Sequence, residues 1–165
     1  MKVQGWMLLA ALAGGAQAEP KLVISAGAQL RLAAAPTLVH SGPLLVYQYG
    51  DWSFSHEALQ GDSFYQGVDL TGMEVPFVRS LFEPRLRQEF APWLAALSEE
   101  QAQVLDITEA NINHSKVGDM EVWSSYNPQA RRGEAFIFID QAVHRLSMKG
   151  GKAQFDELLS AISRR

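Results

Sequence analysis

The sequence predicts an α+β fold in which helices pack on a largely antiparallel sheet within a single domain. Strand-like patterns gather toward the two ends of the chain, and helical patterns lie between them. Segregated strands and helices are typical of α+β proteins, whereas regular alternation predicts a parallel sheet. The last third, residues 119–165, carries the clearest patterns, and the strands expected there are joined by short turns.

The first 18 residues have the features of a signal peptide. Lys2 provides a positive start, residues 6–13 form a short apolar run, and Ala16-Gln17-Ala18 has the small-x-small pattern of a cleavage site. The run is too short to span a bilayer. We expect cleavage near Ala18 and a mature domain of residues 19–165 that is periplasmic or secreted, with no stable membrane anchor. An uncleaved N-terminal anchor is the alternative.

The composition narrows the classes of partner and chemistry. The formal net charge is −4, and because Lys2 is the only charged residue among the first 18, it becomes −5 after cleavage. This negative balance argues against binding to nucleic acid or to an anionic membrane. The chain has 0 cysteines, which excludes disulfides, thiolate metal sites and thiol nucleophiles.

Before the helical middle, the chain predicts short strands and a hairpin. Residues 21–32 suggest one edge strand that is interrupted near Gly27, and residues 44–49 form a stronger strand. Gly50-Asp51 has the residue order that a two-residue type II′ turn favours. We therefore expect a hairpin with a return strand from Trp52, followed by a loop over residues 60–71.

Three prolines divide the predicted helical middle. We expect Pro76 at a first helical position, Pro84 to end that helix and open another, and Pro92 to kink or divide the segment. The stretch Ser98-Glu99-Glu100-Gln101 matches a capping box and predicts a short third helix.

The C-terminal segment predicts a meander and a final helix. A strand is expected over residues 107–114, and Met120 to Tyr126 alternates with a period of two, as a strand requires. Phe136 to Ile139 is apolar on both faces and should be a central strand. Residues 142–148 predict the next strand. The final helix is indicated by apolar residues at i, i+3, i+4 and i+7, namely Phe155, Leu158, Leu159 and Ile162.

From Ile107 onward the pattern resembles the C-terminal half of PsbP-like proteins. The residues that carry the resemblance are the turn Val117-Gly118-Asp119, the strand ending in Tyr126, the Phe136–Ile139 strand, and Phe155-Asp156-Glu157-Leu158-Leu159 leading to Ile162. The resemblance implies an antiparallel sheet between helical layers and a small exported, non-enzymatic protein. It assigns no site residues.

No local motif predicts a catalytic, metal or cofactor site. The four histidines, His40, His56, His114 and His144, are not spaced as metal ligands on a helix. His40-Ser41 and Ser55-His56-Glu57 place hydroxyl and imidazole groups next to each other, but neighbouring residues of a strand point to opposite faces. We predict no catalytic residue, no metal and no cofactor. A metal site or a hydrolase site assembled from distant segments remains an alternative.

Two groups of residues are candidates for binding. Arg131-Arg132 lies in a predicted hairpin loop, where paired guanidinium groups suit a carboxylate; the alternative is solvated charge. Tyr47, Tyr49, Trp52 and Phe54 are an aromatic concentration that marks a binding surface if exposed and a sheet core if buried.

The sequence favours an exported, non-enzymatic protein that binds a periplasmic protein or a small ligand. The alternatives are a small periplasmic hydrolase with a dispersed site and an immunity-type inhibitor of a periplasmic toxin. The oligomeric state and the identity of the ligand are left open.

Overall fold

The computed structural model describes residues 20–41, 44–61 and 67–165, and its largest element is a seven-stranded antiparallel sheet. The strands, in spatial order, are β3 (Leu38–His40), β4 (Leu45–Tyr49), β5 (Trp52–Leu59), β9 (Ala142–Lys149), β8 (Arg132–Ile139), β7 (Met120–Asn127) and β6 (Ile112–Val117). A second antiparallel sheet consists of β1 (Lys21–Val23), β2 (Ala28–Arg31) and β10 (Ile162–Arg164). The helices are α1 (Glu74–Phe82), the 3₁₀ helix η1 (Pro84–Glu89), α2 (Pro92–Val104) and α3 (Lys152–Ser160).

The predicted α+β class with antiparallel sheets is therefore confirmed. Within the described ranges, no helix combines the length and the apolar character needed to cross a bilayer. The predicted signal peptide lies outside the described residues.

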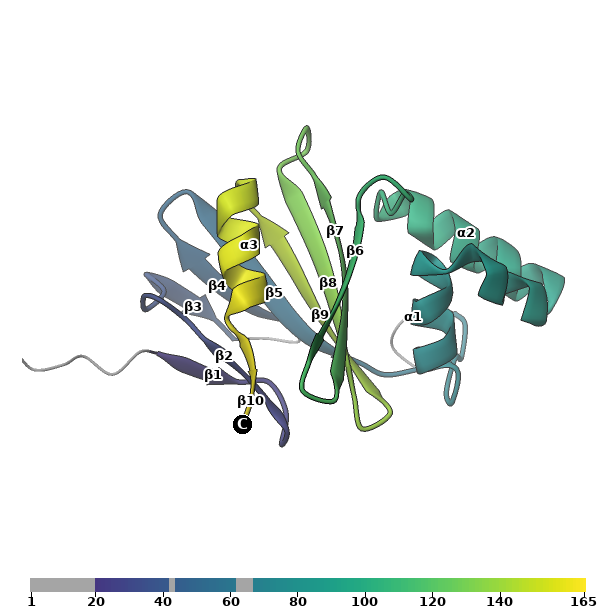
Figure 1. Ribbon diagram of the computed structural model, residues 1–165, viewed down its shortest axis with the longest axis horizontal. Coiled ribbons are helices and arrows are strands. Elements are labelled where there is room, and N and C mark those ends of the chain that lie inside the picture. Colours follow the sequence, from purple (N-terminus) through teal and green to yellow (C-terminus); the bar gives the residue numbers. More distant parts are fainter. Residues whose placement is uncertain (1–19, 42–43, 62–66) are drawn as a thin grey trace, which may run out of the picture.

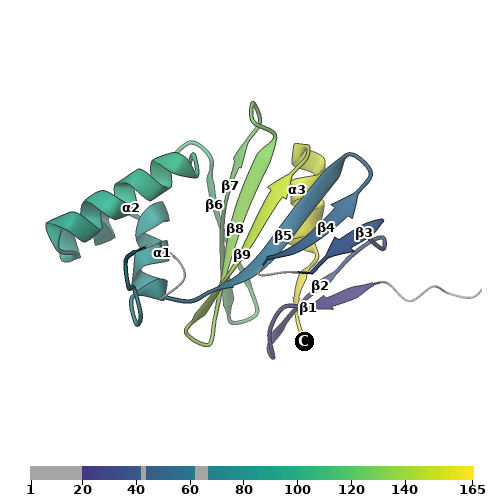
Figure 2. The same ribbon diagram turned by 180° about the vertical axis from the view of Figure 1, so that it is seen from behind.

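The large sheet is covered on both faces by different elements. Figures 1 and 2 show α1 and α2 on one side of it, and α3 with the three-stranded sheet on the other. Each side has its own apolar core: Ile137 of β8 packs with residues of α3 and β2, whereas Phe136 and Phe138 pack with residues of α1 and α2. The two sheet faces are called here the α3 face and the α1/α2 face.

β8 is the central strand that the sequence predicts. Ala135, Phe136 and Ile137 are each 0% exposed, and β8 is hydrogen-bonded to β7 on one side and β9 on the other. Consecutive side chains of a strand point to opposite faces, so an apolar run of this kind needs cover on both sides. The alternation predicted for Met120–Tyr126 is confirmed as well, since Met120 and Val122 are buried on the α3 face.

The C-terminal helix is shorter than predicted. α3 ends at Ser160, and Ile162 lies in β10, which pairs with β2. The predicted helical stripe therefore holds for Phe155 and Leu158 but not for Ile162. The reason is tertiary: β10 completes the small sheet and carries the Ile162 side chain into the same core by a different route.

The N-terminal strands also differ from the prediction. Residues 21–32 form the hairpin β1–β2 rather than one interrupted edge strand. Gly50-Asp51 is a two-residue loop, because Tyr49 pairs with Trp52, but Gly50 does not have the positive φ that a type II′ turn requires. The strand predicted over residues 107–114 begins only at Ile112.

The prolines divide the helical middle, although not all boundaries were predicted correctly. α1 begins at Glu74, two residues before Pro76, and Pro76 is tolerated because the first N–H groups of a helix have no intrahelical partner. Pro84 opens η1, as predicted, and Pro92 divides the helical segment by standing at the start of α2. The predicted helix start at Ser98 is wrong, since α2 continues through it.

The contacts of the Ser98 side chain explain why no new helix begins at this residue. Its hydroxyl is buried and lies 2.7 Å from the Ser80 hydroxyl of α1, and it accepts a hydrogen bond of 3.1 Å from the Nε of Arg87 in η1. Ser98 therefore joins three helical elements instead of capping one.

Gly133 in β8 provides a test of the packing between α3 and the sheet. A Cβ atom at this position would lie 2.4 Å from the ring of Phe155, which is 2% exposed. We expect Gly133→Ala to lower the free energy of unfolding by about 1–3 kcal/mol, because the buried ring has to move. Urea-induced unfolding measures the change.

Gly50→Ala is the matched control for this substitution. A Cβ atom there meets nothing within 4 Å, and the φ angle of Gly50 is not positive. We expect its effect to stay within about 0.5 kcal/mol. Equal stability of the two variants would contradict the close packing of Phe155 on β8.

Candidate functional site

The predicted arginine pair lies beside a hollow at one end of the large sheet. Two turns meet there: the β4–β5 turn at Gly50-Asp51 and the β7–β8 loop before Arg132. The hollow has a volume of about 260 Å³ and is lined by Gln48, Asp51, Trp52, Ser53, Ala130, Arg131, Arg132, Lys149 and Gly150. It is called the cationic hollow, because its lining contains three cations and one carboxylate.

Strand register places four of these nine lining residues in one row. Gln48 is paired with Ser53, Ser53 with Lys149, and Lys149 with Arg132. The row crosses four neighbouring strands on the α1/α2 face, because Arg132 has the same parity in β8 as Phe136. Lys149 is exposed and Arg132 half-buried, so the helices do not cover this end of the sheet.

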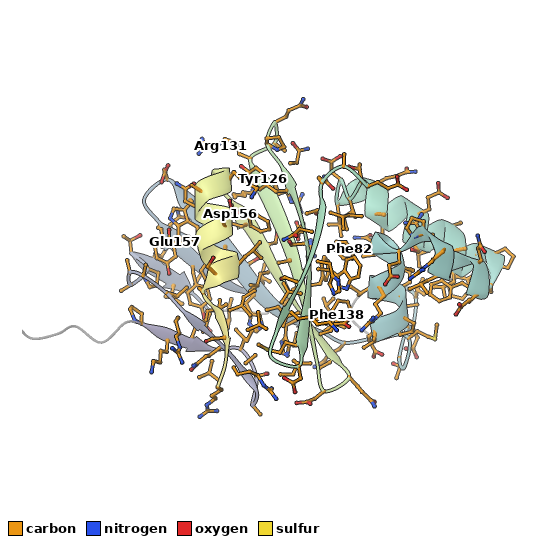
Figure 3. All side chains as sticks on the ribbon, in the orientation of Figure 1. Phe82, Tyr126, Arg131, Phe138, Asp156 and Glu157 are labelled. Atoms are coloured by element: carbon orange, nitrogen blue, oxygen red, sulfur yellow. The ribbon has the colours of Figure 1, made fainter. Side chains whose placement is uncertain are left out.

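The β7–β8 loop fixes the position of Arg131. The Asn127 side chain accepts hydrogen bonds from the backbone N–H groups of Gln129 and Ala130, at 2.8 and 2.9 Å. Arg131 then adopts a left-handed φ of 50°, and its carbonyl accepts a 2.9 Å bond from the N–H of Gly150. Figure 3 shows Arg131 at the upper end of the molecule, beyond α3.

The guanidinium group of Arg132 is hydrogen-bonded to the buried carboxylate of Glu134. Glu134 is 1% exposed, and its Oε1 accepts bonds from the Nε of Arg132 and the hydroxyl of Ser147, both at 2.9 Å. Its Oε2 accepts a 2.9 Å bond from the Nε of Arg145, which also reaches Glu57 at 3.0 Å. A buried carboxylate is tolerated only with such partners.

The same network stabilises the charged form of Arg145. Burial alone would lower the pKa of its guanidinium, but the charges and hydrogen bonds of Glu134 and then of Glu57 outweigh burial and raise that pKa. Arg132 and Arg145 thus neutralise Glu134 and Glu57. By contrast, no ion pair of the described residues involves Arg131 or Lys149.

The predicted aromatic residues separate into core and cavity positions. Tyr47 and Phe54 belong to the core of the α3 face, at 7% and 1% exposed, with their ring centroids 4.8 Å apart. Tyr49 is also buried and stacks on Trp52 at 4.3 Å. The core interpretation therefore holds for Tyr47, Tyr49 and Phe54. Trp52 lines the cationic hollow, and with Tyr49 it also lines another cavity on the α3 face.

Sequence reasoning did not assign Lys149, Gln48 and Ser53 to this site. Lys149 could have been found from the register of the β8–β9 hairpin, because pairing Arg132 with Lys149 follows once the Asp140-Gln141 turn is placed. Gln48 and Ser53 required the order of β4, β5 and β9 in the sheet, which no local pattern reveals.

A larger cavity lies at the opposite end of the sheet and has a different character. It measures about 500 Å³, and its charged lining consists of Glu74, Arg79, Asp119, Glu121 and Asp140. Most of these charges have partners: Arg79 pairs with Glu121, Arg164 with Asp119 at 2.7 Å, and Glu74 accepts the N–H of Gly61 at 3.0 Å. The residues predicted from sequence do not lie here.

Two of the four histidines form a buried pair on the α3 face. The Nε2 of His56 lies 3.2 Å from the Nδ1 of His144, and the residues are 8% and 5% exposed. Burial, and then the charge of His144, lowers the pKa of His56 from 6.5 to about 4; burial lowers the pKa of His144 as well. Histidine lines none of the three cavities, and the described part of the chain contains no cluster of metal-ligating side chains.

No protein-family model, curated protein or solved structure matches the chain. The resemblance to PsbP-like proteins therefore stays a prediction.

The histidine pair makes stability depend on pH. The unfolded chain takes up protons below a histidine pKa of about 6.5, whereas the folded protein resists protonation of His56 until about pH 4. Stability should therefore fall as pH decreases from about 6.5 to about 4, by roughly 3 kcal/mol for a shift of this size. Chemical denaturation across this range measures the loss.

Two substitutions, one inside the buried histidine pair and one outside it, separate the effect of the pair on stability from the effects of other titratable groups. His56→Gln should flatten the pH dependence in this range, because the group that resists protonation is gone. His114→Gln should leave the dependence intact, since His114 stacks on Trp123 at 4.1 Å in a separate part of the sheet. A His56→Gln profile identical to that of the unsubstituted protein would show that the pair is not the cause.

Proposed function

We propose that this is an exported, non-enzymatic binding protein of the bacterial periplasm that takes a small carboxylate ligand at the cationic hollow. The proposed binding site rests on one observation. The β7–β8 loop, the start of β8 and the end of β9 bring Arg131, Arg132 and Lys149 around one hollow, and two of these cations have no ion-pair partner among the described residues.

The charge distribution supports an anionic ligand. The whole chain has a formal net charge of −4. The lining of the hollow, with three cations and one carboxylate, therefore has the opposite sign of charge to the protein as a whole. Cations grouped in a concave site raise the local concentration of anions. A guanidinium group also offers parallel N–H donors that match the two oxygens of a carboxylate.

The size of the hollow supports a small ligand. Its volume of about 260 Å³ lies below the roughly 300–1,000 Å³ of sites that enclose drug-sized molecules. A short dicarboxylate suits both this volume and the two unpaired cations, and the polar side chains of Gln48 and Ser53 complete the lining.

Titration with succinate, followed by amide NMR shifts, tests this site. Succinate should shift amides of the residues that line the hollow, whereas neutral succinamide of the same shape should not. Arg131→Gln or Lys149→Gln should weaken binding roughly tenfold, the loss expected for one hydrogen bond to a charged group. Higher salt should weaken binding too.

Arg85→Gln is the matched control, because the Arg85 side chain is 80% exposed and belongs to η1. It should bind succinate as the unsubstituted protein does. Two results would contradict a charge-selective site: amide shifts with succinamide as large as those with succinate, or a loss of succinate affinity in Arg85→Gln as large as that in Arg131→Gln.

The proposal of export rests on the pattern of residues 1–18. Expression of the full chain in a Gram-negative bacterium, followed by N-terminal sequencing of the periplasmic fraction, should give a protein that begins at Glu19. The signal peptidase requires small residues at the cleavage site, so Ala16→Glu with Ala18→Glu should prevent processing. A periplasmic protein that still begins at Met1 would contradict the proposed cleavage.

A further inference from the structure

One carboxylate lines the cationic hollow without meeting any of its cations. Asp51 lies in the β4–β5 turn and belongs to the lining. The other charged residues there are Arg131, Arg132 and Lys149. Among the described residues, no ion pair includes Asp51. Opposite charges that share one hollow but do not touch leave room between them for a ligand that reaches both.

The side chain of Gln48 fixes the turn that carries Asp51. Its Nε2 donates hydrogen bonds to the carbonyl oxygens of Tyr49, at 2.7 Å, and Trp52, at 3.1 Å, on either side of the turn. Carbonyl oxygens only accept, so these two bonds use both N–H groups of the amide. Gln48 also lines the hollow, and the group that it can still offer to a ligand is the acceptor Oε1. Gln48 and Asp51 therefore both supply acceptors on the β4–β5 side of the hollow.

Gly150 joins the turn that carries Asp51 to the loop that carries Arg131. A Cβ atom at Gly150 would lie 2.7 Å from the Cβ of Trp52, so the residue after Asp51 packs directly against this backbone. The N–H of Gly150 donates to the carbonyl of Arg131 at 2.9 Å. Figure 1 shows the turn and the loop at the same end of the large sheet. The acceptors and the cations are thus held in place before a ligand arrives, which lowers the cost of binding.

The charges of the hollow match a ligand that carries two carboxylates and one ammonium group. Arg132 is paired with the buried Glu134, which leaves two cations, Arg131 and Lys149, and one carboxylate, Asp51. A plain dicarboxylate offers nothing to Asp51, and the like charges repel each other. An ammonium group on the same molecule supplies N–H donors to the acceptors of the β4–β5 side.

We propose that the ligand of the cationic hollow is an acidic α-amino acid, whose ammonium group binds Asp51 and Gln48. Its two carboxylates bind Arg131 and Lys149. This inference rests on the proposed carboxylate site and specifies its ligand. Aspartate has the carbon chain of succinate with one ammonium group added, so the argument from the size of the hollow holds for it as well. At neutral pH its charges are the reverse of those of Arg131, Lys149 and Asp51.

L-Malate is the matched probe, because it carries a neutral hydroxyl group where L-aspartate carries the ammonium group. Binding is followed by the amide NMR shifts of the hollow lining. L-Aspartate should bind roughly three- to tenfold more tightly than L-malate. A hydrogen bond between charged groups contributes more than this when it is buried, but Asp51 is exposed and water screens its charge.

Asp51→Asn isolates the contribution of the carboxylate. The affinity for L-aspartate should fall to about that for L-malate, whereas the affinity for succinate should stay unchanged or rise, because a negative charge has been removed. Retained succinate binding shows that the variant still folds. Asp140→Asn is the matched control, since Asp140 is also an exposed residue of a two-residue turn, at the opposite end of the sheet. It should bind all three probes as the unsubstituted protein does.

Two outcomes would overturn this inference while the succinate site stands. The first is equal affinity of the unsubstituted protein for L-aspartate and L-malate. The second is an equal loss of affinity for all three probes in Asp51→Asn, which would show that the carboxylate shapes the turn and does not bind the ammonium group. If none of the probes, succinate included, shifts the lining amides of the unsubstituted protein, the proposed carboxylate site fails and this inference fails with it.

Discussion

The apolar character of β8 on both of its faces dictates how the rest of the chain is arranged. Phe136 and Phe138 point one way and Ile137 the other, and burial of each such side chain contributes on the order of 1.5–3 kcal/mol. Water must be excluded from both faces at once. The chain meets this requirement with α1 and α2 on one side and with α3 and the small sheet on the other (Figure 1).

The same strand also determines where the cationic hollow forms. β8 begins with Arg132, Gly133 and Glu134 before its apolar run starts, and of these three residues Arg132 is only half-buried whereas Gly133 and Glu134 are buried. Glu134 lies at the boundary and is buried, and Arg132 and Arg145 compensate its charge. Arg132 therefore stays at the edge of the covered region, next to Lys149 of β9. The change from polar to apolar residues along β8 thus separates the residue that lines the cationic hollow from the residues that form the two apolar cores.

The two faces of the sheet present different kinds of side chain at this end. The α3 face carries the aromatic ladder of Tyr47, Tyr49 and Phe54, and a small cavity lies between Tyr49 and α3. The α1/α2 face carries the polar row from Gln48 to Arg132. Because side chains alternate along β4 and β5, this one hairpin contributes to both faces of the sheet.

Local patterns were sufficient to predict the elements that need no distant partner, whereas features that join remote segments required the folded chain. The apolar strand Phe136–Ile139 follows from periodicity, and Pro84 and Pro92 open helical segments because proline suits a first turn. Ile162 fits a helical stripe by spacing, but pairing of β10 with β2 places it in a strand. Arg131 and Arg132 are adjacent in sequence, but they line one hollow with Lys149 and Trp52 only because β9 and β5 bring those residues to the same end of the sheet. Periodicity fixes which way a side chain points, whereas its partners depend on strand order and burial, which are properties of the whole fold.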